Sequence, residues 1–79
     1  MKIEYRKGLL YTSLKIVYKS KSKVVENIII DTGAAHTIIS PKIDFGIIDD
    51  AGTINGLLGL DLLIQCEAVI DLKKLEVNI

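Results

Sequence analysis

A nearly continuous apolar run over residues 24–30 ends abruptly at Asp31-Thr32-Gly33. Its last three residues are Ile28-Ile29-Ile30, and such a run of β-branched residues is typical of a strand that is buried on both faces. A buried strand is held rigidly by its neighbours, so the turn that follows it starts from a fixed position. The run therefore predicts a β fold and gives Asp31 a rigid support.

Several other segments alternate apolar and polar residues with a period near two, which predicts further strands. We expect strands over residues 3–5 and 10–18 around a turn at Gly8, and a strand over 37–40 that stops at Pro41. The polar stretch 19–23 is interpreted as a solvated hairpin tip rather than a phosphate-binding patch. Three more expectations are a strand carrying Ile43, Phe45 and Ile47, a turn at 49–52, and a terminal hairpin that pairs Ala68, Ile70 and Leu72 with Leu75, Val77 and Ile79.

One segment departs from this pattern and predicts a short helix. After Gly59, the apolar residues Leu60, Leu63 and Ile64 fall at helical spacing. Asp61 then lies in the first turn, where a carboxylate interacts favourably with the helix dipole.

Composition limits the partners and the setting of the chain. Its 79 residues are enough for one small domain, 1–79, with a core that profits from additional buried surface in an oligomer. Ten basic residues balance ten acidic ones, which argues against nucleic acid or an anionic membrane as a partner. No apolar run approaches the roughly 20 residues that span a bilayer. A single cysteine and a polar N-terminus predict a reducing, cytoplasmic setting.

Asp31 is the candidate for chemistry. Hydrolysis of a peptide bond by water needs a base for the water proton and an acid for the carbonyl oxygen, and two close carboxylates that share one proton supply both. Asp-Thr-Gly alone is a common turn, because Asp and Gly dominate turns for conformational reasons. The interpretation of Asp31 therefore depends on the sequence around it.

That context is specific. The segments Asp31-Thr32-Gly33-Ala34, Thr37-Ile38-Ile39-Ser40 and Asn55-Gly56-Leu57-Leu58-Gly59-Leu60-Asp61 occur in this order. Together they resemble the retroviral-type and small bacterial retropepsin-like aspartic peptidases, and the resemblance covers residues 1–40 and 43–79. It implies an all-β, acid-protease-like β-barrel subunit with one short helix near the C-terminus, acting as a homodimer.

The resemblance also implies roles for individual residues. Asp31 would be the catalytic carboxylate, with Thr32 bonded across the dimer to the partner's loop and Gly33 lining the cleft. Ala34, Ala35 and His36 would border the substrate, an extended polypeptide. Leu57-Leu58-Gly59 would pass beneath Asp31 and begin the helix. The mechanism needs no metal and no organic cofactor.

Two departures from the family pattern bear on activity. No Gly-rich hairpin of the kind that forms the family's flap lies between Ser40 and Ile43, so either the flap is deleted or a segment is omitted from the sequence. Leu60 occupies the place of an Arg that retroviral members use in dimer salt bridges. The terminal segments 2–5 and 75–79 are then the candidates for pairing between chains.

Other polar residues have simpler interpretations. Five further Asp residues lie at strand ends, turns or the helix start, where solvent-facing structural roles are expected: Asp44, Asp49, Asp50, Asp61 and Asp71. His36 lacks neighbours at metal-ligand spacing and is expected at the surface or the cleft edge, and Cys66 is expected in the core.

Two rival hypotheses remain open. One is a flapless, catalytically inactive dimer that binds an extended peptide or only assembles. The other is a monomeric β protein with a coincidental Asp-Thr-Gly turn.

Overall fold

The computed structural model describes residues 1–40 and 54–79 of the chain. These residues form strands and one short helix, which confirms an all-β chain with a helix near its C-terminus. The elements are β1 (Glu4–Arg6), β2 (Leu9–Tyr18), β3 (Lys21–Ile30), β4 (Ile38–Ile39), β5 (Gly56–Leu58), α1 (Leu60–Gln65), β6 (Val69–Asp71) and β7 (Glu76–Asn78).

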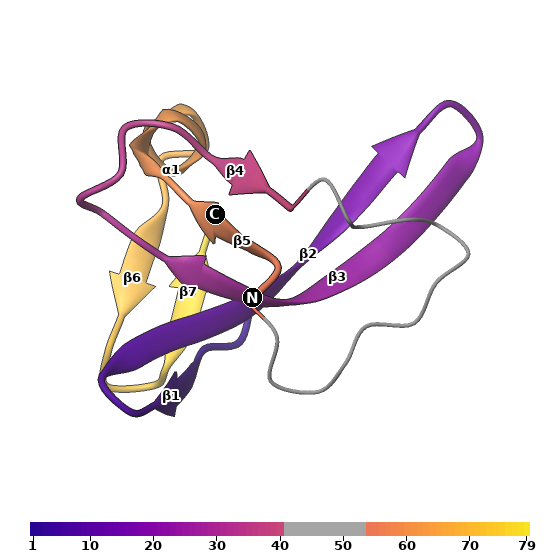
Figure 1. The fold of residues 1–79 in the computed structure, drawn as a ribbon. Coiled ribbons are helices and arrows are strands. Elements are labelled where there is room, and N and C mark those ends of the chain that lie inside the picture. The colour runs from indigo at the N-terminus through magenta and orange to yellow at the C-terminus, as the bar shows by residue number, and fades with distance from the viewer. Residues whose placement is uncertain (41–53) are drawn as a thin grey trace.

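The larger sheet has five strands in the order β1-β2-β3-β5-β4 (Figure 1). β2 and β3 form a long antiparallel hairpin that projects from the rest of the described chain, and β1 pairs antiparallel with β2. β5 runs parallel to the end of β3 and antiparallel to β4. Because β3 leads through residues 31–37 into β4, the later strand β5 lies between two strands that precede it in the sequence.

Two tight turns set the pairing register of β1 with β2 and of β2 with β3. Lys7 and Gly8 connect β1 to β2, and both have positive φ, as a two-residue turn of the I′ type requires. The turn between β2 and β3 is also short, because Tyr18 already pairs with Lys21. The solvated tip predicted for residues 19–23 is therefore smaller than expected, and β3 begins at Lys21 instead of Val24.

A bulge interrupts β3 halfway along its length. Thr12 pairs with Ile28 while Leu14 pairs with Val25, so two residues of β3 lie opposite one residue of β2. One of the two, Asn27, has a φ of 60°, a left-handed conformation that Asn tolerates better than most residues.

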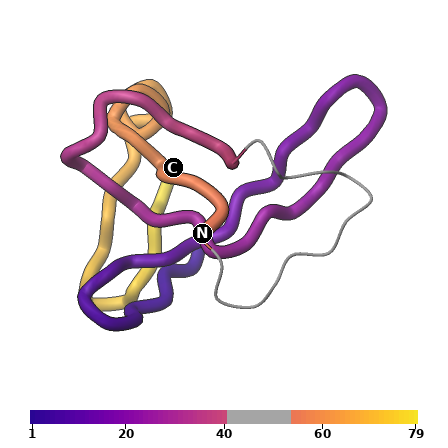
Figure 2. The backbone as a smooth tube through the Cα atoms, viewed as in Figure 1, coloured from indigo at the N-terminus to yellow at the C-terminus, as the bar shows by residue number. Residues whose placement is uncertain are grey.

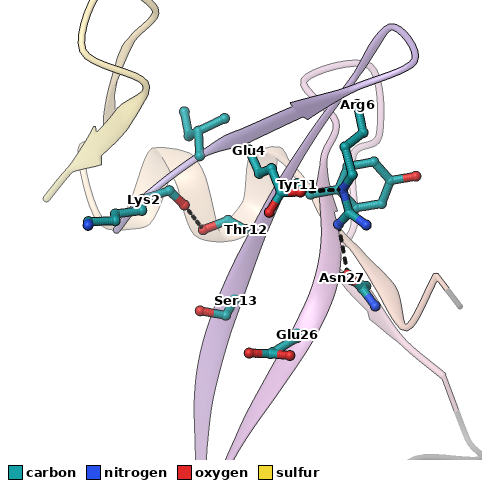
Figure 3. Close-up of a pocket in the computed structure, with 9 residues that line it drawn as sticks. Lys2, Glu4, Arg6, Tyr11, Thr12, Ser13, Glu26 and Asn27 are labelled. Atoms are coloured by element: carbon teal, nitrogen blue, oxygen red, sulfur yellow. Dashed lines mark hydrogen bonds and ion pairs between the residues drawn. The ribbon is translucent and has the colours of Figure 1, made fainter. Parts of the chain in front are cut away.

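Arg6 ties the bulge to β1. Its guanidinium donates a 2.7 Å hydrogen bond to Asn27 Oδ1, lies 3.1 Å from the Glu4 carboxylate and stacks 3.8 Å from the centre of the Tyr11 ring (Figure 3). A cavity of about 380 Å³ opens beside this cluster, lined by the N-terminal segment, β1, β2 and the bulge. None of its lining residues belongs to the predicted site.

The C-terminal hairpin forms as predicted, with Ile70 opposite Val77. The N-terminal segment joins it, because the N–H of Val77 donates to the Met1 carbonyl at 2.7 Å and the N–H of Ile3 donates to the Leu75 carbonyl at 2.8 Å. The two terminal segments that we expected to pair between chains thus pair with each other within one chain.

The core lies where the two sheets and the helix meet. Ile28 and Val25 of β3 are fully buried, and they pack with Leu58 of β5, Leu63 of α1 and Val77 of β7. Ile28, Ile29 and Ile30 are all buried, as the apolar run predicted. One expectation next to the helix is wrong: Cys66, expected in the core, is exposed. Ile64 is also 69% exposed, because the six-residue helix turns only Leu63 fully inward.

The described strands make an open sheet and a separate hairpin, not the closed barrel that we expected (Figure 1). The predicted strand with Ile43, Phe45 and Ile47, the turn at 49–52 and the absence of a flap between 40 and 43 lie outside the described residues. None of the helices in the described part is both long enough and apolar enough to cross a membrane.

Candidate functional site

Asp31 directly follows the last residue of β3 and is half-buried. Its backbone N–H donates to the Leu58 carbonyl of β5 at 3.0 Å, which continues the parallel pairing of the two strands past the end of β3. The rigid support predicted from the isoleucine run therefore comes from β3 itself and from β5 beside it.

The Asp31 carboxylate is oriented by the turn that follows. Gly33 donates its N–H to Asp31 Oδ1 at 2.9 Å, and Ala34 donates its N–H to the Asp31 carbonyl at 3.1 Å. A Cβ at position 33 would lie 3.2 Å from the same carboxylate oxygen, so the absence of a side chain lets the turn close tightly. One oxygen of the Asp31 carboxylate thus has a fixed hydrogen-bond donor, and the two hydrogen bonds together hold the turn in one conformation.

The loop over residues 31–37 rests on the segment where β5 leads into α1 (Figure 2). The N–H of Leu60 donates to the Ala34 carbonyl at 2.8 Å, and the N–H of Asp61 donates to the Ala35 carbonyl at 3.1 Å. Gly59 makes this contact possible, because a Cβ there would lie 2.7 Å from the His36 carbonyl oxygen, closer than real Cβ contacts allow. The Leu57-Leu58-Gly59 segment therefore supports the loop from one side.

Thr37 and Asp61 close the loop at its far end. Both carboxylate oxygens of Asp61 lie 3.0 Å from the Thr37 backbone N–H, and the Thr37 hydroxyl donates to Asp61 Oδ1 at 2.7 Å. The same hydroxyl accepts the N–H of Gly59 at 2.9 Å. Asp61 also accepts the N–H of Leu62 at 2.7 Å, so this exposed carboxylate joins the start of α1 to the start of β4.

These donors change the acidity of Asp61. The Thr37 N–H, followed by the Thr37 hydroxyl, holds the pKa of the Asp61 carboxyl below its ordinary value. Partial desolvation opposes the shift, while the Leu62 N–H and the nearby His36 add to it. The ionised form of Asp61 is therefore the form that the folded loop favours.

The predicted site residues occupy one continuous surface loop. Thr32, Gly33, Ala35 and His36 are exposed, and Ala34 is half-buried against the helix start. This loop contains no carboxylate other than that of Asp31. His36 is exposed, which agrees with the expected position at the surface or the cleft edge.

The other described Asp residues have hydrogen-bond partners of their own. Asp61 is bonded to Thr37, and Asp71 accepts the N–H groups of Lys73 and Lys74 at 3.0 Å in the β6–β7 turn. Asp44, Asp49 and Asp50 lie outside the described residues. No group of three or more His, Cys, Asp or Glu side chains in the described ranges gathers as metal ligands would.

Sequence reasoning missed the link between Thr37 and Asp61. We assigned Asp61 to the helix dipole and to solvent, and the residue is indeed exposed. The available signal was an Asp just after the Gly-Leu-Leu-Gly segment together with a Thr at the far end of the Asp31 loop. Neither residue by itself indicates a contact across 24 positions.

No family model, curated protein or solved structure matches the chain.

Proposed function

We propose that the chain is a retropepsin-like aspartic endopeptidase that works as a homodimer, with Asp31 as its catalytic carboxylate. The observation that carries the proposal is the placement of Asp31 at the buried end of β3, on a loop that is braced by backbone hydrogen bonds from the segment where β5 leads into α1. A half-buried carboxylate with one oxygen bound to Gly33 is oriented and still open to a partner group. Such rigid positioning is what a shared-proton pair requires.

In the proposed mechanism the two Asp31 side chains of a dimer share one proton. Two carboxylates about 3 Å apart cannot both be ionised cheaply, so one stays protonated, an effect for which the aspartic proteases are themselves the standard example. The ionised Asp31 takes a proton from the attacking water, and the protonated one polarises the peptide carbonyl. Thr32 would bond across the dimer, and Ala34, Ala35 and His36 would border an extended polypeptide.

In this proposal a second chain supplies the second carboxylate of the pair. Among the described residues, Asp61 and Asp71 are already bonded to their own partners, so neither is available beside Asp31. Exposed apolar side chains offer a surface for association: Met1, Leu62 and Ile79 line a small apolar cavity of about 80 Å³ near the chain ends. The terminal segments pair with each other within one chain. A dimer that involves them would therefore form either by exchange of the N-terminal segments between two chains or by pairing of the free edges of the terminal segments.

The proposal is tested by peptide cleavage at mildly acidic pH, with products identified by mass spectrometry from a mixture of extended peptides. Asp31→Asn removes the shared proton site and is expected to lower kcat by about 10²–10⁴-fold. Asp71→Asn is the matched control, because it changes a carboxylate in a distant turn, and it should cleave like the wild type. Equal cleavage by Asp31→Asn and wild type would remove Asp31 from the mechanism.

A second candidate function keeps the same loop without the chemistry. The sequence has no Gly-rich hairpin between Ser40 and Ile43, and a closing flap is what excludes water and positions the scissile bond in such enzymes. A non-catalytic dimer would bind the same extended peptides without cleaving them. Saturable binding by wild type and Asp31→Asn alike, with no product from either, would favour this alternative.

A further inference from the structure

The contact between Thr37 and Asp61 is unusual for an exposed carboxylate. Asp71, the Asp of the β6–β7 turn, bonds to Lys73 and Lys74, its close neighbours in sequence. Asp61 instead takes the N–H and the hydroxyl of Thr37, which lies 24 positions away. A contact of an exposed carboxylate contributes little to overall stability, so what matters here is which two segments it joins.

The two ends of the Asp31 loop are anchored to the same short segment. At its start, the Asp31 N–H donates to the Leu58 carbonyl, and at its end Thr37 is bound by Gly59 and Asp61. Between these anchors, the backbone N–H groups of Leu60 and Asp61 hold the carbonyls of Ala34 and Ala35. Of these contacts, the Thr37 anchor alone depends on a carboxylate side chain.

We infer that Asp61 and Thr37 are positioning residues for Asp31. Resting on the proposed peptidase function, this inference assigns the carboxylate of Asp61 the task of fixing the far end of the loop, so that the Gly33 and Ala34 N–H groups stay aimed at Asp31. Loss of the anchor leaves the backbone N–H groups of Leu60 and Asp61 bonded to the carbonyls of Ala34 and Ala35. The chain then stays folded while the Asp31 carboxylate turns away from its productive direction, and a displacement of about 1 Å can cost about 10²-fold in rate.

The kinetic test compares Asp61→Ala and Thr37→Val with wild type. Each is expected to lower kcat by about 10²-fold with KM nearly unchanged. The double variant should be little slower than Asp61→Ala, because that change already removes the carboxylate to which both the N–H and the hydroxyl of Thr37 donate. Thr37→Ser keeps the hydroxyl and the N–H and should retain most of the wild-type kcat. Asp71→Ala, which loses two comparable N–H bonds elsewhere, should match wild type.

A second readout does not depend on catalysis. Hydrogen exchange of the Gly33 and Ala34 amides reports how firmly the loop holds its bonds to Asp31. Exchange at these two amides is expected to be faster in Asp61→Ala and Thr37→Val, and unchanged in Thr37→Ser and Asp71→Ala. This comparison remains decisive if Asp31→Asn shows that the protein is not a peptidase.

Two results would overturn the inference. One is unchanged exchange at Gly33 and Ala34 in Asp61→Ala. The other, in an active enzyme, is equal loss of kcat in Asp61→Ala and Asp71→Ala, which would show a general effect of weakened folding.

Discussion

Asp61 and Asp71 show how two residues of the same type, both accessible to solvent, can differ in what they hold together. Asp71 stabilises a turn that the sequence already favours, since its partners are two and three positions away. Asp61 joins the start of a helix to a loop formed 24 positions earlier. At the scale of single residues, the Asp61 contact reaches the loop that carries Asp31, whereas the Asp71 contact stays within its own turn.

The lowered pKa of Asp61 makes its contribution to folding dependent on pH. A carboxyl whose pKa is lower in the folded state stabilises that state above its unfolded pKa, which is about 3.9 for Asp. The contribution is lost as pH falls through the folded pKa. We therefore expect Asp61→Asn to be less stable than wild type at pH 7, and the difference to shrink steadily below about pH 4.

Urea unfolding of both proteins at several pH values, at one fixed protein concentration, checks this prediction. The protein concentration is fixed because association would shift the midpoint. A difference in unfolding free energy that stays constant from pH 7 to the most acidic value would contradict it.

At this scale the sequence was sufficient to predict the structural support of Asp31 but not the hydrogen-bond partner of Asp61. The support of Asp31 follows from a local pattern, three β-branched residues just before it, and those residues are buried. The partner of Asp61 depends on the order of the strands in the sheet. Asp61 can reach Thr37 only because β5 runs beside β3. No spacing along the chain encodes that arrangement.

At the scale of elements, the bulge in β3 fixes where the long hairpin changes register. Asn27 holds the left-handed position of the bulge, receives the Arg6 guanidinium and offers its carbonyl to the Asn55 N–H at 3.0 Å. Asn55 in turn donates from its side chain to the Glu26 carbonyl at 2.7 Å. The bulge therefore connects β1 to the residue that precedes β5.

We predict that the backbone conformation of Asn27 matters more than its side chain. Asn27→Val places a β-branched residue at positive φ and is expected to destabilise the chain by about 1–2 kcal/mol more than Asn27→Gly does. Asn27→Gly keeps the conformation and loses only the Arg6 hydrogen bond. Chemical denaturation of the two variants checks the order, and equal stabilities would show that the left-handed conformation is not what constrains this position.

Turns and element ends that are determined by nearby residues were predictable from the sequence. The full lengths of the strands were not. The turn at Gly8, the end of β3 at Ile30 and the start of α1 after Gly59 all follow from nearby residues. Residues 21–23 looked like a polar bend, yet they form strand because their pairing to β2 is set by the turn and needs no apolar face. The pairing of Met1 with Val77 joins the two ends of the chain, which periodicity cannot reveal.

At the scale of the whole molecule, the described chain leaves apolar surface that its own core does not cover. Ile79 is 75% exposed, and Met1 and Leu62 remain partly exposed beside the apolar cavity near the chain ends. A small domain buries a limited fraction of its surface, so association is a physically reasonable way to cover more. The open sheet has edges at β1 and β4 that a second chain could also extend.

A shared active site makes a quantitative prediction about mixtures of chains. Each site of the proposed dimer needs two intact Asp31 residues, so a mixed dimer with one Asp31→Asn chain is inactive. When wild type is mixed with an equal amount of Asp31→Asn and allowed to exchange, random pairing places about half of the wild-type chains in mixed dimers. The activity of that wild-type protein should therefore fall to about half. An equal amount of Asp71→Asn, which carries an intact Asp31, should cause no such loss. Full retention of activity with Asp31→Asn present, after exchange is demonstrated with differently labelled chains, would mean that a single chain holds the complete site.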